Sequence, residues 1–195
     1  MQELNEQILI YLNSLTSNKI IASISSIFAD SPIFILPLFL IISWIFFTYK
    51  VKDNEKKKNL LFIFYSTVIA IIINLIIQNL FHFDRPETVL EGAGNLILKH
   101  LPDASFPSDH AAVSFSFLSA LFLANYKKTA YILIIPFLIM NISRVILGVH
   151  WPFDVLVGSI IGIISAFISF KLLKKCNIII KLNDCILKIM NYIKL

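Results

Sequence analysis

The sequence predicts an all-α protein, a multi-pass transmembrane helix bundle formed by a single domain over residues 1–195. Hydrophobic residues make up 57% of the chain and charged residues 15%, whereas a soluble domain carries about 25% charged residues. The chain also contains several apolar stretches of about 20 residues, the length that crosses a bilayer. This composition excludes an ordinary soluble domain, and the high apolar content excludes a disordered chain.

Five stretches are long and apolar enough to be predicted as membrane spans. Because the number is odd, the two ends of the chain are expected on opposite sides of the membrane. The spans define a transmembrane core over residues 32–173. They cover residues 32–49, 60–80, 108–125, 129–148 and 152–173.

The two ends of the chain are predicted to form helices that lie in the membrane interface. In residues 1–31 the apolar sequence is interrupted, which favours one or two interfacial helices over the alternative of a sixth span. Residues 176–195 have apolar residues at helical spacing with lysines between them, which predicts an amphipathic cytoplasmic tail. The interrupting residues of the first segment are Asn13, Ser14, Ser17, Asn18 and Lys19.

The distribution of lysines predicts the topology. With five spans, 13 of the 15 lysines fall on one side of the membrane, which the positive-inside rule identifies as cytoplasmic. Residues 81–107 and the turn around His150 then share the outer side. These lysines flank apolar spans and do not form one basic face, so we expect no nucleic-acid partner. Residues 1–6 lack a basic segment, and we expect no cleaved signal peptide.

Arg85 and Arg144 are the only arginines in this lysine-rich chain, which suggests that lysine would not serve in their place. A guanidinium binds phosphate through two parallel hydrogen bonds and does not lose its charge. Arg144 lies within an apolar run, where an arginine costs about 2.5–3.5 kcal/mol to insert and is a functional candidate by default. The alternative for either residue is an arginine that extends to the interface from the end of a span.

A second candidate group lies at the start of the third span. Ser108 is predicted to cap this helix, with Asp109 and His110 in its first turn. Free backbone N–H groups at a helix N-terminus form an anion site, beside which a protonated His110 could donate a proton. The alternative is a capped helix whose histidine faces the lipid headgroups.

A third group is formed by Ser143 and Arg144 followed, after five residues, by His150 and then Asp154. Pro152 suits the first position of the fifth span, which places Asp154 in its first turn. A carboxylate there can fix the tautomer of His150 and leave its other nitrogen free to attack. The alternative is an interfacial belt anchored by Trp151, which does not explain an aspartate inside an apolar span.

Together, two arginines, two histidines, an aspartate and a helix N-terminus are expected at the outer ends of adjacent spans. This set suits phosphoryl transfer through a phosphohistidine, with arginines and amides stabilising the phosphoryl oxygens and a second histidine protonating the leaving group. No His, Asp or Glu cluster has metal-ligand spacing, so we expect no metal and no other cofactor. Cys176 and Cys185 lack a CxxC spacing and are interpreted as reduced, inert thiols.

The three groups resemble the motifs of the type 2 phosphatidic acid phosphatase (PAP2) superfamily, which are Lys-x6-Arg-Pro, Pro-Ser-Gly-His and Ser-Arg-x5-His-x3-Asp. The third motif matches at every fixed position. The resemblance implies that His150 is the nucleophile, oriented by Asp154, and that His110 is the general acid. It further implies that the phosphate is bound by Arg85, Arg144 and Ser108.

The chain departs from these motifs at two positions. Gln78 stands where the first motif has lysine, and Asp109 replaces the glycine of the second. Both residues are retained as candidate phosphate contacts. Lys99 or His100, in the same outer loop, could supply the missing positive charge.

The sequence around Asp109 is similar to a branch of the superfamily, the bacterial undecaprenyl-diphosphate phosphatases of the BcrC type that are linked to bacitracin resistance. The resemblance implies removal of the terminal phosphate from undecaprenyl diphosphate at the outer face of the bacterial cytoplasmic membrane. The product, undecaprenyl phosphate, would be reused as a carrier of cell-wall glycans. The implied partners are the polyprenyl diphosphate substrate and membrane lipids.

Three other functions remain open at this point. The chain could be a phosphatase for phosphatidylglycerol phosphate, phosphatidic acid or lipid A, or a phosphotransferase that passes the phosphate to a second lipid. It could also be a transporter or channel whose polar pathway contains Arg144 and Asp154. The spans lack paired Gly or Pro breaks in two halves, which disfavours transport.

Overall fold

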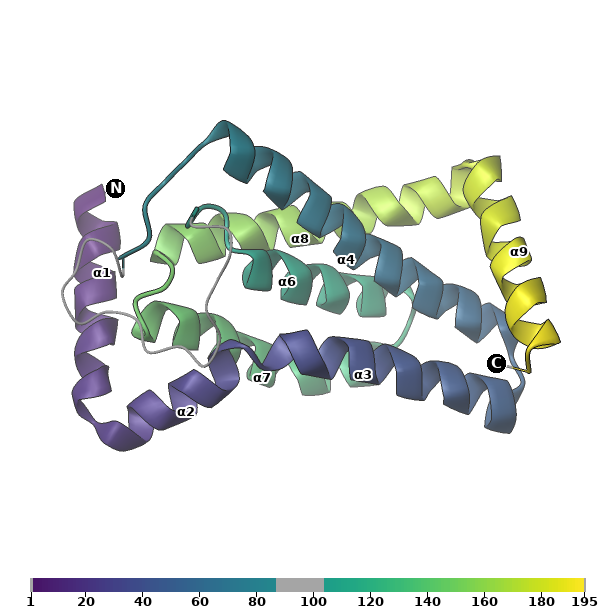
Figure 1. Ribbon diagram of the computed structural model, residues 1–195, viewed down its shortest axis with the longest axis horizontal. Helices are drawn as coiled ribbons and strands as arrows, with labels where there is room; N and C mark the ends of the chain where they lie inside the picture. Colours follow the sequence, from purple (N-terminus) through teal and green to yellow (C-terminus); the bar gives the residue numbers. More distant parts are fainter. Residues whose placement is uncertain (1, 87–103, 195) are drawn as a thin grey trace.

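The computed structural model describes residues 2–86 and 104–194, and the regular structure within these residues is helical. Most of the helices run side by side, and two short ones lie across the ends of the bundle (Figure 1). The elements are α1 (Gln2–Ser14), η1 (Leu15–Ser17), α2 (Lys19–Ala29), α3 (Ser31–Phe46), η2 (Phe47–Val51), α4 (Asn54–Leu80), α6 (Asp109–Leu123), α7 (Lys127–Ile146), α8 (Pro152–Lys175) and α9 (Asn177–Tyr192).

Four of the predicted spans form helices that are long and apolar enough to cross a membrane. They are α3 with its π-helical extension η2, then α4, α7 and α8. Helix α4 begins six residues before the predicted apolar stretch, because Asp53 caps it by accepting from the backbone N–H groups of Glu55 and Lys56. The prediction of a multi-pass helix bundle is therefore confirmed.

The remaining predicted span, residues 108–125, is a helix of only 15 residues, α6. At 1.5 Å per residue it is about 22 Å long, shorter than a hydrocarbon core of about 30 Å. It ends early because Asn125 adopts a left-handed conformation with φ of 66°. Helix α6 lies in the middle of the bundle (Figure 1), and Phe117 and Leu121 on it are fully buried.

Helices α6 and α8 pack closely through two glycines. A Cβ atom added at Gly158 would collide with the carbonyl oxygen of Ser108, and one at Gly162 would collide with that of Ala112. Small residues of this kind allow helix backbones in membranes to approach one another. The start of α6 is therefore held directly against α8.

The terminal segments form short helices, as predicted. Residues 2–29 fold into α1 and α2, neither of which has the length of a span, so the described residues provide no sixth crossing. In Figure 1, α1 lies across one end of the bundle and α9 across the other. The location of the terminal helices α1, α2 and α9 in the membrane interface remains a prediction.

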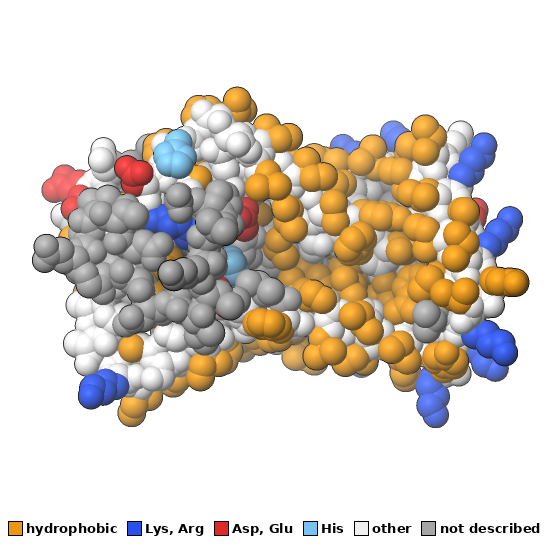
Figure 2. Space-filling view, in the orientation of Figure 1, with side chains coloured by type: hydrophobic (Ala, Val, Ile, Leu, Met, Phe, Trp, Pro, Cys, Tyr) orange, Lys and Arg blue, Asp and Glu red, His pale blue; other side chains and the backbone are white. Residues whose placement is uncertain are grey.

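Charged and apolar side chains are segregated along the bundle. Figure 2 shows a broad apolar belt around the middle of the molecule and lysines gathered at the end where α9 lies. Acidic side chains appear at the opposite end, where Figure 1 places α1. This segregation is typical of a membrane protein, in which lysine and arginine gather on one side of the bilayer.

Candidate active site

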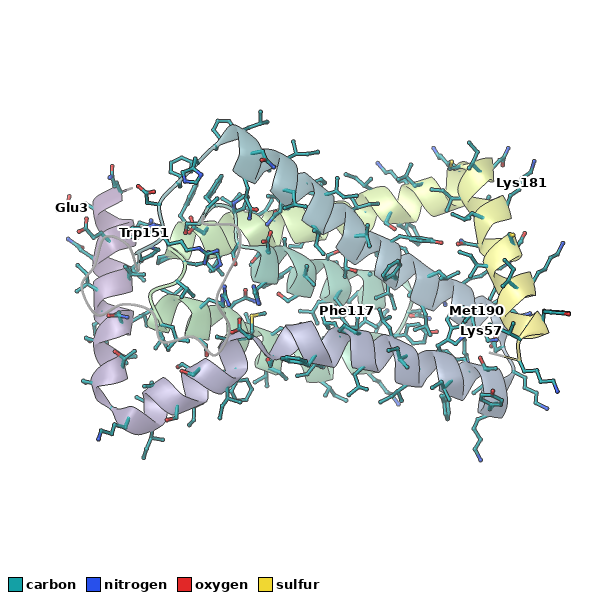
Figure 3. All side chains as sticks on the ribbon, in the orientation of Figure 1. Glu3, Lys57, Phe117, Trp151, Lys181 and Met190 are labelled. Atoms are coloured by element: carbon teal, nitrogen blue, oxygen red, sulfur yellow. The ribbon has the colours of Figure 1, made fainter. Side chains whose placement is uncertain are left out.

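The structure brings the predicted site residues together at the end of the bundle that carries α1 and α2. They come from four places in the chain: the segment after α4, the first turn of α6, the last turn of α7 and the turn into α8. The side chains that meet there include Arg85, Ser108, Asp109, His110, Arg144, His150 and Asp154. Figure 3 shows Trp151 at this end, and its indole N–H donates to the carbonyl of Asp84 at 3.0 Å.

His150 lies in the turn between α7 and α8. Gly148, with φ of 70°, allows the chain to turn back after α7, and His150 is only 2% exposed. Its Nδ1 lies 2.9 Å from the carbonyl oxygen of Ser105, and its Nε2 lies 3.2 Å from Nη2 of Arg144. A carbonyl can only accept and a guanidinium can only donate, so Nδ1 carries the proton and Nε2 holds a lone pair.

The charge state of His150 follows from its surroundings. Burial lowers the pKa of His150 well below 6.5, and the positive charges of Arg144 and Arg85 lower it further. The imidazole is therefore neutral at neutral pH. A neutral imidazole with a lone pair on Nε2 is the form that a histidine nucleophile requires.

Asp154 reaches His150 indirectly. Its Oδ2 is 3.7 Å from Nδ1 of His150, which is too long for a hydrogen bond, and it accepts instead from the backbone N–H of Trp151 at 2.9 Å. It also accepts from the hydroxyl of Ser105, whose own carbonyl binds His150. The contact of Asp154 with His150 thus runs through Ser105, whereas the sequence predicts direct contact.

Arg144 is fully buried and is held by a carboxylate that the sequence analysis missed. Its Nη1 donates to Oδ1 of Asp30 at 2.6 Å, while Nη2 faces His150. The same Asp30 oxygen lies 3.4 Å from Nε2 of His110. Asp30 is 3% exposed and lies between α2 and α3, far in sequence from all three motifs.

Arg85 connects the segment after α4 to the turn that holds His150. Its guanidinium donates to the carbonyls of Val149 at 3.2 Å and Ala104 at 3.4 Å, and the residue is 6% exposed. Both arginines therefore lie beside His150, and the charges of both act electrostatically on it. Two positive charges next to Nε2 of His150 are an arrangement that can bind an anion.

Ser108 is the N-cap of α6, as predicted, but its hydroxyl does not cap the helix. The hydroxyl is buried and has no hydrogen-bond partner among the described residues. The backbone N–H of Ser108 donates to the carbonyl of Asp154, which fixes the start of α6 against α8. A buried hydroxyl beside the first N–H groups of a helix can bind a phosphoryl oxygen.

Gln78 and Asp109 contact each other. The side-chain N–H of Gln78 donates to Oδ1 of Asp109 and to the carbonyl of Pro107, both at 3.1 Å. Asn74, one turn earlier on α4, donates to the same two oxygens at 2.9 and 3.3 Å. These contacts tie the start of α6 to α4, so their role as phosphate contacts remains a prediction. The candidate cations Lys99 and His100 lie outside the described residues.

Three side chains of the site were missed by sequence reasoning. Asp30 has a clear signal in retrospect, because it is the only charged residue between Lys19 and Lys50. Asn74, in the middle of an apolar span, was also detectable as an expensive polar residue. Ser105 has no such signal, because its contribution comes from contacts of its hydroxyl and its carbonyl with residues far along the chain. Within residues 2–86 and 104–194, no three His, Cys, Asp or Glu side chains are arranged to hold a metal ion.

Comparison with known proteins identifies the family. The PAP2 superfamily matches residues 59–178 of this chain. A protein of Bacillus licheniformis named "Bacitracin transport permease protein BcrC" is 32% identical over 73% of this chain and 66% of its own length. A protein of Bacillus subtilis named "Undecaprenyl-diphosphatase BcrC" is 27% identical over 79% of this chain and 76% of its own length.

The fold is also found among solved structures. The crystal structure of a transmembrane PAP2-type phosphatidylglycerolphosphate phosphatase from Bacillus subtilis superposes with a TM-score of 0.61 and 27% identity. The superposition covers 90% of this chain and 87% of that protein. The family match includes the segments that supply Gln78, Arg85, His110, Arg144, His150 and Asp154. The chain therefore belongs to the PAP2 superfamily.

Proposed function

We propose that this protein is an integral membrane phosphatase that hydrolyses undecaprenyl diphosphate to undecaprenyl phosphate and phosphate. The observation that carries the proposal is the contact between a buried, neutral His150 and Arg144, with His110 and Asp30 in the same cluster. Relatives named as undecaprenyl-diphosphatases, at 27–31% identity, support the choice of substrate.

In the first step, Nε2 of His150 attacks the terminal phosphorus of the diphosphate. The N–P bond forms, the bond to the bridging oxygen breaks, and the departing undecaprenyl phosphate takes a proton from a protonated His110. Arg85, Arg144, the Ser108 hydroxyl and the first N–H groups of α6 stabilise the charge on the transferred phosphoryl oxygens.

In the second step, water attacks the phosphohistidine. The neutral His110 left by the first step accepts a proton from this water, the N–P bond breaks, and phosphate departs. His150 returns to its neutral form with Nδ1 still bound to the Ser105 carbonyl. The proposed cycle uses residues of the cluster, the first N–H groups of α6 and one water, and we expect it to need no metal ion.

An apolar cavity beside His110 supports a lipid substrate. It has a volume of about 360 Å³ and runs between α3, α4 and α6 from Asp109 and His110 toward Phe117. Leu36, Ile71 and Val113 are among its lining residues. A diphosphate at the cluster would leave its first isoprenoid units in this cavity, within the apolar belt of Figure 2.

The position of the cluster supports an outward-facing site. It lies at the end of the bundle opposite the lysines, and the positive-inside rule places that lysine-rich end in the cytoplasm. Hydrolysis would then occur at the outer face of the bacterial cytoplasmic membrane and would return undecaprenyl phosphate to the pool of cell-wall carriers.

A second candidate function is hydrolysis of another lipid phosphate. The solved phosphatidylglycerolphosphate phosphatase, at 27% identity, favours phosphatidylglycerol phosphate as the alternative substrate. Phosphatidic acid and lipid A would use the same phosphohistidine. Transfer of the phosphate to a second lipid would differ only in the acceptor of the second step.

The direct test is phosphate release by the purified protein in detergent with EDTA present. Undecaprenyl diphosphate, phosphatidylglycerol phosphate and phosphatidic acid are compared, with His150→Ala as the control. We expect the highest kcat/KM with the diphosphate and no release by the variant. A higher kcat/KM for either of the other lipids would reassign the substrate, and activity that requires added metal would refute the metal-free mechanism.

A further inference from the structure

The position of Asp30 suggests a role that goes beyond the three motifs. An aspartate at the N-cap of a helix normally accepts from that helix's own first N–H groups. Asp30 is the N-cap of α3, yet its side chain makes no capping hydrogen bond. Its carboxylate instead enters the cluster, where it is 3% exposed. A buried carboxylate that is not used for capping needs another stabilising partner.

Its partners are the two groups that would handle the phosphoryl group and the proton. Oδ1 of Asp30 lies 2.6 Å from Nη1 of Arg144 and 3.4 Å from Nε2 of His110. The bond to Arg144 fixes the guanidinium so that Nη2 points at His150. The proximity to His110 favours the protonated imidazole, which is the form that can donate a proton.

The other carboxylates of the cluster have partners of their own. Asp154 accepts from the Ser105 hydroxyl and from the backbone N–H of Trp151. Arg144 on α7 and Arg85 after α4 are positive and disfavour a second positive charge on His110. Helix α4 presents uncharged Asn74 and Gln78, which bind Asp109 on the same turn as His110. His150 is neutral. Asp30 is therefore the carboxylate best placed to keep His110 protonated beside two arginines.

We propose that Asp30 is a positioning residue of the phosphatase: its carboxylate aligns Arg144 against the nucleophile and keeps His110 in its proton-donating form. The proposal rests on the proposed function, because it assigns Asp30 a task in that reaction. It also gives the junction between α2 and α3 a functional role, since that junction supplies the carboxylate from outside the family motifs.

The test compares Asp30→Asn with wild type in the undecaprenyl diphosphate assay across a range of pH. Asparagine keeps the shape and removes the charge, so kcat should fall roughly tenfold to a hundredfold. The alkaline limb of the kcat profile should move by about one pH unit or more toward lower pH, because His110 loses its proton sooner. The control is Asp53→Asn at the distant cap of α4, which should behave as wild type.

A second variant, Asp30→Glu, covers the case in which the asparagine variant does not fold. Glutamate retains the charge but displaces it, so kcat should fall while the alkaline limb stays near its wild-type position. An unchanged kcat and pH profile in Asp30→Asn would refute the proposal, as would a Glu variant whose alkaline limb moves by as much as that of the Asn variant. Failure of the wild type to release phosphate would instead refute the proposed function.

Discussion

At the scale of single residues, the site is defined by which nitrogen of His150 carries the proton. The Ser105 carbonyl and the Arg144 guanidinium assign that proton to Nδ1 from opposite sides of the ring. Burial and two positive charges then keep the ring neutral. In the proposed mechanism, Nε2 can therefore attack without a separate deprotonation step.

The lowered pKa of His150 predicts the acid side of the pH profile. The proposed attack needs neutral His150, and a pKa below 6.5 keeps it neutral as the pH falls through that value. The acid limb of kcat/KM should therefore lie well below pH 6.5. A profile of kcat/KM for the diphosphate tests this, and an acid limb at or above pH 6.5 that tracks His150 would contradict it.

In the proposed mechanism Asp154 acts through Ser105, which predicts defects of different size in two variants. Asp154→Asn should lower kcat about a hundredfold or more with little change in KM, because the tautomer and orientation of His150 are lost. Ser105→Ala should lower kcat by less, since the carbonyl that binds His150 remains. Steady-state kinetics test both variants. A wild-type kcat for Asp154→Asn would show that Asp154 has no role in the reaction.

At the scale of elements, the α6–α8 contact determines where Ser108 and His110 lie. Gly158 touches the carbonyl of Ser108, and the N–H of Ser108 donates to the carbonyl of Asp154 at 3.1 Å. The two motif segments are thus joined backbone to backbone. The sequence predicts the ends of α6 to within two residues, because Ser108 marks its start and Asn125, followed by Lys127 and Lys128, marks its end.

Gly158→Ala should disturb both stability and activity. The added methyl group overlaps a backbone carbonyl, which cannot rotate away, and overpacking of this kind costs about 1–3 kcal/mol. The apparent Tm in detergent and kcat should both fall. Ser159→Ala, a change at the next position whose hydroxyl bonds within α8, is the control and should change neither. If Gly158→Ala had the Tm and kcat of the wild type, the space between Gly158 and the Ser108 carbonyl would have to accommodate a methyl group, which would contradict the close α6–α8 contact.

At the scale of the whole molecule, the sequence supports a reliable prediction of the class, of most spans and of the motif residues. Long apolar runs and exact motif spacing are local features, so they can be detected without coordinates. Asp30 and Asn74 stand out in the sequence as isolated polar residues, but the partners that bring them and Ser105 into the site lie in distant segments. No local pattern identifies those partners. The sequence predicts a direct contact between Asp154 and His150 for the same reason, because the bridging Ser105 lies in a distant segment.

The membrane orientation is tested with the two native cysteines. Cys176 and Cys185 lie at the lysine-rich end and are predicted to be cytoplasmic. A membrane-impermeant maleimide should label neither in intact cells and should label Cys185 after permeabilisation. In a cysteine-free variant, Glu3→Cys at the end with the catalytic cluster should be labelled in intact cells. The reverse pattern would place the active site in the cytoplasm.

The most direct test of the account is capture of the phosphohistidine. Undecaprenyl diphosphate labelled with ³²P at its terminal phosphate is mixed with the enzyme, quenched within milliseconds, and the protein is digested for mapping. We predict an acid-labile, base-stable label on His150 that appears before free phosphate and is absent from His150→Ala. Release of phosphate from the diphosphate with the label on another residue, or with activity retained in His150→Ala, would contradict the central claim.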